Sequence, residues 1–271
     1  MTILIAGCGY LGTHLGKDLL RKGHEVWGLR RNPVALAGSG IRPLTADLSK
    51  PETLKALPPH DVAVLAQAPG GHDGDYESTY VLGTKNFIEA ARRHAPKLIQ
   101  ISSTGVYGTD DGSWVDEKTD PKPADTNGEA LLGAEALTRE SGLRAVILRL
   151  GGLYGPRRHR LKPLKEGKIK PVLSEKFVNR IRVEDAAAAV EVLMEKGESG
   201  EIYLGVDDLP STQKEFYGWL CPRMGIRSAP ADAGPEKSLG KRCSNRKLKA
   251  LGMCLVYPDF RLGYADLLKE V

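Results

Sequence analysis

The sequence predicts a doubly wound α/β fold: a parallel β-sheet with helices on both faces and a small lobe at the carboxyl end. The chain opens with a short, uncharged, β-branched segment, residues 3–6, that passes through three glycines into an amphipathic helix. Segments of strand length then alternate with segments of helical periodicity to about residue 150. This alternation is typical of a parallel sheet. At 271 residues and 41% hydrophobic composition, the chain can bury a large core.

The opening strand and helix are joined by the pattern Gly7-x-Gly9-x-x-Gly12. In a Rossmann-type fold, the first glycine permits a tight turn, the second lets the backbone approach a pyrophosphate, and the third lets the helix pack on the strand. The phosphate then lies at the helix N-terminus, beside Tyr10 and Leu11. A purely structural glycine turn is the alternative. Because the pattern lies between a strand and a helix, it predicts an NAD(P) site.

The second strand is expected at residues 24–31 and ends in Arg30 and Arg31. An NAD site usually has an acidic residue here, which accepts hydrogen bonds from the ribose. Guanidinium groups instead can bind a 2′-phosphate through two hydrogen bonds. The pair therefore favours NADP as cofactor, with NAD and two solvated arginines as the alternative.

Four apolar segments predict the remaining strands of the sheet, and segments with helical periodicity predict the helices that connect them. Strands are expected at residues 41–46, 62–66, 98–102 and 146–150, and helices at 51–57, 76–94 and 127–140. The polar segment 110–125 is expected to be a connection. Ligands of open α/β sheets lie beyond the carboxyl ends of the strands. Ser102 and Ser103 after the fifth strand, and Gly151 and Leu153 after the sixth, are therefore expected beside the nicotinamide end.

Beyond residue 155 the regular alternation ends. A basic, irregular stretch leads to an alanine-rich helix at 183–194, a strand at 201–205 and a helix at 211–224 capped by Ser211 or Thr212. We expect a dinucleotide-binding domain at 1–155, with part of 176–210 completing its sheet. Residues 156–271 are then a small, discontinuous substrate-binding lobe.

Composition and charge narrow the class of partner. The net charge of +5 is modest and contains no long run of like charges, which favours small anionic ligands over nucleic acid. The four cysteines show no zinc spacing, so no metal site is predicted. We expect no leader and no membrane span, because the N-terminus is not basic and no apolar segment approaches the roughly 20 residues that a membrane span needs. We therefore expect a cytoplasmic protein without a membrane partner.

A series of different short motifs extends over nearly the whole chain. Besides the glycine pattern, they are Asp47-Leu48, Gly83-Thr84-x-Asn86, Ser102-Ser103-Thr104-x-Val106-Tyr107-Gly108, Leu153-Tyr154-Gly155-Pro156, Val183-Glu184-Asp185 and a C-terminal segment at 244–252. With them the chain resembles the extended short-chain dehydrogenases/reductases, specifically the NAD-dependent epimerase/dehydratase family. The resemblance implies that Asp47, beside Leu48, contacts adenine, that Leu65, Ala66 and Gln67 line the dinucleotide, and that Ser103 binds the reacting substrate oxygen.

The chain departs from this family at its catalytic dyad. The family carries Tyr-x-x-x-Lys, whereas the alignment places Asn127 and Leu131 at these two positions. Asparagine is neither acid nor base near neutral pH, and leucine supplies no positive charge. Tyr80 also replaces an asparagine of the preceding helix. The chain thus resembles atypical members that lack the dyad, and we expect the Tyr80 ring to fill the space above Leu131.

Two functions follow from these residues. The first is an NADP-dependent oxidoreductase or epimerase-like enzyme in which Ser103 holds the reacting oxygen and Tyr107 or Tyr80 handles the proton. Thr104 and Asn127 would orient the substrate. A group of basic residues would receive an anionic substrate, either a phosphate or a nucleotide-sugar diphosphate: Arg157, Arg158, His159 and Arg180.

The second function is a non-catalytic NADP(H)-binding sensor or regulatory protein, favoured by the loss of the dyad. The hydroxyl groups retained at the reacting end favour the enzyme. In either case a homodimer would pair the two long helices that follow the fourth and fifth strands, as often occurs in this superfamily.

Overall fold

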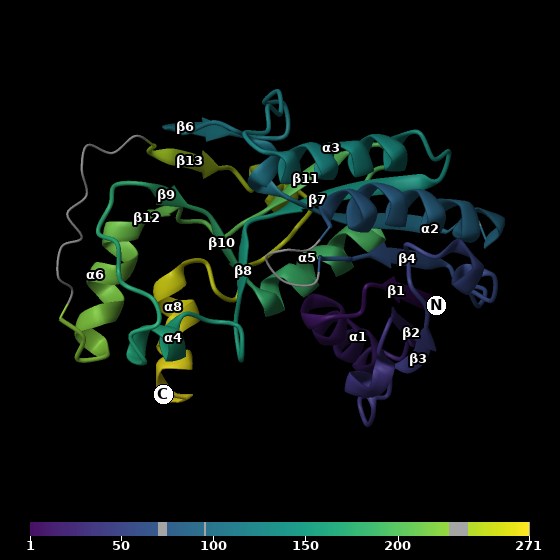
Figure 1. The fold of residues 1–271 in the computed structure, drawn as a ribbon, viewed down its shortest axis with the longest axis horizontal. Helices are drawn as coiled ribbons and strands as arrows, with labels where there is room; N and C mark the ends of the chain where they lie inside the picture. The colour runs from purple at the N-terminus through teal and green to yellow at the C-terminus, as the bar shows by residue number, and fades with distance from the viewer. Residues whose placement is uncertain (70–74, 95, 228–237, 271) are drawn as a thin grey trace.

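A seven-stranded parallel β-sheet forms the larger half of the protein in the computed structural model (Figure 1). The structure describes residues 1–69, 75–94, 96–227 and 238–270. In spatial order the strands are β11 (Ile202–Gly205), β7 (Arg144–Leu150), β5 (Lys97–Ser103), β4 (Val62–Leu65), β1 (Thr2–Ala6), β2 (Glu25–Arg30) and β3 (Arg42–Thr45). Every neighbouring pair is parallel, which confirms the predicted sheet.

The strand order reverses direction at the centre of the sheet. From β1 the chain proceeds outward through β2 and β3, then returns to the other side of β1 to add β4, β5, β7 and β11. Outside the carboxyl ends of β1 and β4 the two sets of connections diverge and leave a crevice. The topology therefore fixes where a ligand can enter.

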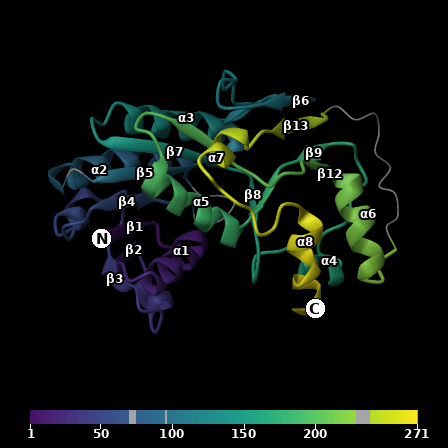
Figure 2. The ribbon, with the colours of Figure 1, turned by 180° about the vertical axis from the view of Figure 1, so that it is seen from behind.

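Helices cover both faces of this sheet. Helices α1 (Tyr10–Arg21) and α5 (Val183–Lys196) pack side by side on one face, which is nearer the viewer in Figure 2. Helices α2 (Gly83–Ala91) and α3 (Thr126–Arg139) cover the other face. Alternate residues of β1 belong to two separate apolar clusters, Ile3 and Ile5 to the first and Leu4 and Ala6 to the second. The central strand is thus buried on both sides, as its uninterrupted apolar sequence predicts.

The helix predicted at residues 76–94 changes its winding along its length. It begins as a π-helical turn at Glu77–Leu82, continues as α2 and ends in a 3₁₀ turn at Arg92–His94. A π-turn widens the backbone and is frequent at functional sites. It carries Ser78, Thr79 and Tyr80 to the edge of the crevice.

The smaller half consists of short elements around an aromatic core. Strands β8 (Gly152–Tyr154) and β10 (Arg180–Arg182) form a parallel pair. A four-stranded sheet contains β12 (Ser211–Thr212), β9 (Phe177–Val178), β13 (Gly240–Cys243) and β6 (Asp111–Val115). The helices are α4 (Leu161–Lys165), α6 (Gln213–Arg223), α7 (Arg246–Ala250) and α8 (Phe260–Ala265). Phe216, Leu220, Phe260 and Tyr264 pack together at the centre of this half.

Several elements differ from the sequence prediction. The supposed connection 110–125 contains β6, and β13, α7 and α8 were not predicted. In β6 only Gly112 and Val115 are buried, so its sequence lacks the alternation that marks a strand. The segment 51–57 forms only a 3₁₀ turn at Pro51–Leu54. These short elements depend on tertiary partners far away in the sequence.

Helix α6 begins at a capping box, which decides between the two predicted caps. The Thr212 hydroxyl accepts a hydrogen bond from the Glu215 N–H (3.1 Å), and the Glu215 carboxylate accepts one from the Thr212 N–H (2.7 Å). Thr212 is therefore the cap, whereas Ser211 uses its hydroxyl to accept from Arg180.

Candidate active site

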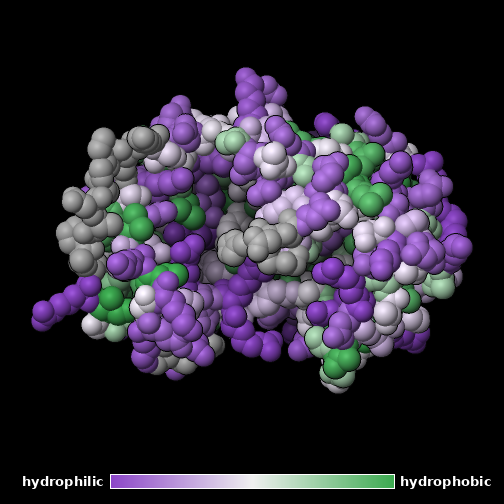
Figure 3. All heavy atoms as spheres, viewed as in Figure 1, coloured by the Kyte–Doolittle hydropathy of each residue, from purple (hydrophilic) through white to green (hydrophobic). Residues whose placement is uncertain are grey.

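A cleft of about 670 Å³ lies at the carboxyl edge of the sheet, at the crevice set by the strand order. Figure 3 shows that this side of the molecule is hollowed between its two halves, with mainly hydrophilic side chains around the hollow. Most of the predicted cofactor residues line the cleft: Gly7, Gly9, Tyr10, Leu11, Arg30, Arg31, Asp47, Leu48, Ala66, Gln67, Ser102 and Leu153.

Three predicted cofactor residues do not line it. A Cβ on Gly12 would lie 2.8 Å from Ile5 Cγ2, so Gly12 allows close helix packing and does not meet the ligand directly. Leu65 is fully buried beneath α2, because the residue alternation along β4 directs its side chain into the core. A Cβ on Gly151 would lie 3.0 Å from the Asn179 carbonyl oxygen, so this glycine faces the smaller half.

The glycine turn fits the approach of a pyrophosphate. Gly7 adopts φ +78°, and a Cβ there would lie 2.6 Å from the Gln67 backbone N, so only glycine fits. A Cβ on Gly9 would instead meet only the Gly7 carbonyl, at 3.8 Å. The space above Gly9 is therefore open. No side chain caps the N-terminus of α1, which leaves its first N–H groups to an anion.

Polar groups surround the end of the cleft formed by β2 and β3. The Asp47 carboxylate accepts hydrogen bonds from the Ser49 N–H (3.0 Å) and hydroxyl (2.8 Å). Partial burial acts to raise the pKa of Asp47, but the Ser49 hydrogen bonds and the charge of Arg31 together lower it below its ordinary value. Arg30 donates to the Cys8 carbonyl at 3.3 Å. Both arginines and an ionised carboxylate thus border this end.

Gln67 supplies an acceptor at the middle of the cleft. Its Nε2 donates to the Thr84 hydroxyl (2.8 Å) and to the Tyr80 carbonyl (3.3 Å), which fixes the orientation of the amide. Its Oε1 is buried and has no hydrogen-bond partner among the described residues. A buried acceptor without a partner is costly unless a ligand supplies a donor. Together with the open space at Gly9, this orphaned oxygen fits a bound dinucleotide.

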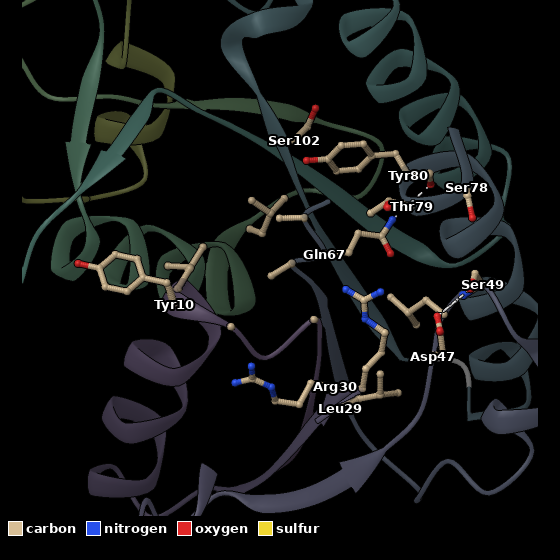
Figure 4. A pocket seen from close by; sticks show the side chains of 18 of the residues that line it. Tyr10, Leu29, Arg30, Asp47, Ser49, Gln67, Ser78, Thr79, Tyr80 and Ser102 are labelled. Atoms are coloured by element: carbon tan, nitrogen blue, oxygen red, sulfur yellow. Dashed lines mark hydrogen bonds between the residues drawn. The ribbon is translucent and has the colours of Figure 1, made fainter. Parts of the chain in front are cut away.

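Ser102, Ser103 and Tyr80 meet at the other end of the cleft. The Ser102 hydroxyl donates to Glu135 Oε1 at 2.5 Å, and the Ser103 hydroxyl accepts from the Gly105 N–H at 3.0 Å. Tyr80 reaches from its helix toward Ser102 (Figure 4). Because its proton is committed to Glu135, Ser102 can present only lone pairs to a ligand. The Ser103 hydroxyl keeps its proton available for a reacting oxygen.

Tyr107 does not reach the cleft, which corrects its assignment as a proton donor. Its side chain is 1% exposed. The Tyr107 hydroxyl donates to the Asp116 carbonyl (2.8 Å) and accepts from Arg149 (2.7 Å). Arg149 in turn forms a buried double hydrogen bond with Glu135 (3.0 and 2.6 Å). Tyr107 therefore belongs to the buried network behind Ser102.

Tyr80 packs beside the cluster that contains Leu131, the residue that the sequence comparison places at the lysine position of the dyad. Its ring packs against an apolar cluster that includes Leu131 and Val106, as the replacement of a small asparagine led us to expect. Burial raises the pKa of Tyr80 to about 12. Its hydroxyl makes no hydrogen bond to the described residues and lies on the cleft wall. At neutral pH it can donate a proton in a hydrogen bond but cannot act as a base.

A second cavity of about 320 Å³ adjoins the cleft and shares Leu153 and Arg158 with it. Of the predicted substrate residues, His159 and Arg180 line this cavity. Thr104, Asn127 and Arg157 line neither space, which corrects their assignment. Thr104 is buried against Cys243, and Arg157 is exposed to solvent.

The sequence did not indicate several residues of the two cavities. Four residues at or near the carboxyl ends of strands also line the cleft and could have been found from the shared strand edge: Leu29, Ala46, Ile101 and Leu150. Phe216, Tyr217 and Tyr264 line the second cavity from α6 and α8. No sequence signal connects those helices with β8 and β10, because their contact is purely tertiary.

Metal clusters and membrane spans are both absent from the part of the chain that the structure describes. Within the described ranges, no group of three or more histidine, cysteine or acidic side chains could hold a metal ion. No helix in the same ranges is long and apolar enough to cross a membrane.

Known proteins resemble this chain over almost its full length. Protein YeeZ of Escherichia coli strain K12 is 27% identical over 267 residues, covering 95% of this chain and 96% of YeeZ. A solved structure from Methylobacillus flagellatus, provisionally named an NAD-dependent epimerase/dehydratase, is 34% identical with a TM-score of 0.84 and covers 99% and 98% of the two chains.

Structures with bound nicotinamide dinucleotides share the fold. The dTDP-glucose 4,6-dehydratase DesIV of Streptomyces venezuelae, solved with NAD and TYD, has a TM-score of 0.85 at 20% identity over 99% of this chain and 96% of its own. Human SDR39U1, solved with NADPH, has a TM-score of 0.81 at 21% identity over the whole of both chains. The family model for the NAD dependent epimerase/dehydratase family matches residues 3–204. The chain therefore belongs to the NAD-dependent epimerase/dehydratase family.

Proposed function

We propose that the protein is an NADP(H)-dependent oxidoreductase or epimerase-like enzyme acting on a small anionic substrate. The observation that carries this proposal is the shared wall of the two cavities, formed by Leu153 and Arg158. A dinucleotide in the cleft and a ligand in the second cavity would meet there. The reacting end of the cofactor would lie near Ser102 and Ser103, which line the same part of the cleft.

The preference for NADP rests on Arg30 and Arg31. Both border the cleft beside Asp47, where the adenosine ribose of a dinucleotide is expected. Arg30 is partly held by the Cys8 carbonyl, whereas Arg31 is exposed and can turn toward a 2′-phosphate. Relatives of this fold were solved with either NADPH or NAD. NAD is therefore the alternative cofactor, and a comparison of NADPH and NADH affinities must distinguish the two.

Ser103 and Tyr80 are the residues that we assign to the chemistry. When bound, the cofactor supplies hydride transfer. Ser103 would hold the reacting oxygen of the substrate through its hydroxyl proton. Tyr80, which keeps its proton at neutral pH, would donate a second hydrogen bond to that oxygen. Arg158, His159 and Arg180 would bind the anionic part of the substrate in the second cavity.

A protein that binds NADP(H) without turnover is the second candidate. It is favoured by one observation: Asn127 and Leu131, at the dyad positions, do not line the cleft and carry no group able to transfer a proton. An enzyme of this kind therefore needs Ser103 and Tyr80 to act without a neighbouring lysine. This difference can be tested directly.

Calorimetry with NADPH and NADH, followed by a turnover assay, tests the proposal. NADPH should bind more tightly than NADH, and the loaded protein should oxidise or reduce a member of a panel of small phosphorylated and carboxylated alcohols and ketones. Ser103→Ala should abolish that turnover while NADPH affinity is retained. Tight NADPH binding with no turnover on the panel supports the sensor, and failure of both nucleotides to bind rejects both candidates.

Two further features stay predictions. The division into a dinucleotide-binding domain at 1–155 and a substrate-binding lobe at 156–271 assumes that the substrate binds in the second cavity. A homodimer would use helices α2 and α3, near which Leu82 is 41% exposed. Light scattering during size-exclusion chromatography would measure the mass, and Leu82→Glu should convert such a dimer to a monomer.

A further inference from the structure

The second cavity is lined by basic side chains and, among the described residues, by no acidic one. The basic members are Arg158, His159, Arg160 and Arg180. Such a surplus of positive charge in a confined space favours a ligand with more than one negative charge. A phosphate monoester, which carries nearly two charges at neutral pH, satisfies this better than a carboxylate does.

Arg180 is the fixed element of this positive wall. It is 9% exposed, and its Nη1 donates to the Val178 carbonyl (3.1 Å) and to the Ser211 hydroxyl (2.8 Å). Its guanidinium lies 4.2 Å from the centre of the Phe216 ring. Nε and Nη2 make no hydrogen bond to any residue that the structure describes. The guanidinium is thus held in one orientation with two donors remaining for an anion, a preorganised arrangement.

The buried Asp207 carboxyl group does not neutralise Arg180. Asp207 is 2% exposed, and its carboxylate oxygens form neither a hydrogen bond nor an ion pair with Arg180. Burial raises the pKa of Asp207 well above its ordinary value, against the charge of Arg180. No direct ion pair therefore occupies the free edge of Arg180, and a ligand anion can take that place.

The aromatic side chains of the cavity leave no ring face for a nucleobase. Tyr154 and Tyr264 stack on each other with their centres 4.8 Å apart, and Arg180 covers a face of Phe216. Tyr217 meets Phe216 edge to face. All four rings are at most 5% exposed. Recognition of a base usually employs stacking on an open aromatic face, and these faces are already used.

The volume of the second cavity also favours a ligand without a nucleobase. Its volume of about 320 Å³ is at the lower end of the roughly 300–1,000 Å³ typical of ligand pockets. We propose that the second cavity takes a compact phosphate monoester, of the size of a sugar phosphate, with its phosphate on Arg180 and its body toward Leu153. This inference depends on the proposed function in one respect: it takes the phosphate monoester to be the substrate.

Calorimetry on the NADPH-loaded protein tests the inference, because bound NADPH keeps other phosphates from the N-terminus of α1. Glucose 6-phosphate, ribose 5-phosphate, inorganic phosphate, glucose and UDP-glucose are titrated separately. We expect at least one of the two sugar phosphates to bind, inorganic phosphate to compete with it, glucose not to bind, and UDP-glucose to bind at least tenfold more weakly. Loss of two charge-assisted hydrogen bonds in Arg180→Met should weaken the sugar phosphate about tenfold or more.

Variants of exposed residues are included because Arg180 is buried and its replacement could disturb folding. Arg158→Ala, which removes an exposed side chain, should also weaken the sugar phosphate. Arg157→Asn is the matched control: Arg157 lines neither cavity, and asparagine tolerates its φ of +63°. A cooperative thermal unfolding transition in each variant shows that the protein is folded.

Three outcomes overturn the inference. The first is UDP-glucose binding as tightly as the sugar phosphates, the second is sugar phosphate binding that Arg180→Met and Arg158→Ala leave unchanged, and the third is no binding of either sugar phosphate. The same titrations with the Gly9→Val protein keep this question separate from the cofactor. Binding there that depends on Arg180 supports the inference even if the unmodified protein binds neither NADPH nor NADH, a result that rejects only the proposed function.

Discussion

Gly9 and Gly12 are three residues apart but have different surroundings. A side chain at Gly9 would enter the open cleft, whereas one at Gly12 would collide with Ile5. We predict that Gly9→Val abolishes NADPH binding and leaves thermal stability nearly unchanged. Gly12→Val should instead destabilise the fold by about 1–3 kcal/mol through overpacking. Calorimetry and thermal unfolding separate the two effects, and a Gly9→Val protein with normal NADPH affinity contradicts the pyrophosphate site.

We predict that Arg30 and Arg31 decide between NADPH and NADH. A charge-assisted hydrogen bond to the 2′-phosphate is worth about 1.5–3 kcal/mol, or roughly tenfold to a hundredfold in affinity. The double variant Arg30→Ala, Arg31→Ala should lose this much NADPH affinity and keep its NADH affinity. Calorimetry with both nucleotides measures the difference. An equal loss for both would mean that the arginines bind a group common to NADPH and NADH.

Tyr80 combines a packing role with a proposed chemical one, and two substitutions separate them. Tyr80→Phe should leave stability unchanged, because the hydroxyl has no hydrogen-bond partner among the described residues. Tyr80→Ala should cost about 1–3 kcal/mol, less than the roughly 3–5 kcal/mol of a fully buried ring, because the side chain is only half-buried. Denaturant unfolding measures both values. On an identified substrate, full turnover by Tyr80→Phe would remove the chemical role and retain the packing role.

Residue types at the ends of strands could be predicted, but their hydrogen-bond partners could not. The glycine turn, the arginine pair and Gln67 follow from sequence position, because all lie at one edge of the sheet. Tyr107 belongs to the same short motif as Ser103, yet it turns into the core. Nothing in the motif reveals that Arg149, 42 residues later, binds its hydroxyl.

At the scale of elements, helix α6 gives a local test of stability. Its capping box joins Thr212 and Glu215 through two hydrogen bonds. Thr212→Ala should cost about 0.5–2 kcal/mol. Glu215→Gln is the matched control, since glutamine can still accept from the Thr212 N–H. Chemical denaturation measures the free energies of unfolding. A Thr212→Ala protein as stable as the control would show that tertiary packing alone holds this end of α6.

Elements of the central sheet were predictable because each carries its own signal. Strand β1 is buried on both faces and is apolar throughout, so burial and sequence agree. Strand β6 is different, since it obtains its pairing from β13, more than a hundred residues later. The π-turn at Glu77–Leu82 was also beyond prediction, because its sequence is compatible with an ordinary α-helix. The missed elements are those whose conformation is decided by their partners.

At the scale of the whole molecule, Asp207 links the sheet to the smaller half. It follows β11, its N–H donates to the Arg180 carbonyl (2.7 Å), and the N–H of the next residue, Asp208, donates to the Pro258 carbonyl (2.9 Å). Because the Asp207 carboxyl group is buried, its titration makes global stability depend on pH.

The sign of this dependence follows from the raised pKa of Asp207 in the folded protein. Above the ordinary aspartate pKa of about 4, the unfolded chain releases this proton while the folded protein retains it. The contribution of Asp207 to stability is therefore greatest at low pH and decreases as pH rises toward the folded-state pKa. We predict that Asp207→Asn is increasingly more stable than the unmodified protein from about pH 4 to neutral pH.

Thermal unfolding over this pH range, without ligands, measures the prediction. Below about pH 4 the two proteins should have similar stability, since the carboxyl group is protonated in both the folded and unfolded states. Stability curves that remain parallel across the range would mean that Asp207 is ionised in the folded protein.

Strand β13 has a consequence for the order in which the protein matures during synthesis. Its Lys241 ammonium donates to the Tyr107 carbonyl, and Asn179 joins it to the smaller half through bonds to the Lys241 carbonyl (2.9 Å) and the Cys243 N–H (2.7 Å). The turn that carries Ser103 is thus braced by residues translated more than a hundred codons later. At about 5–20 residues per second, a nascent chain spends many seconds with its glycine turn complete and its serine turn unbraced. The glycine turn is thus complete before the segment that carries Ser103 is held in place by β13.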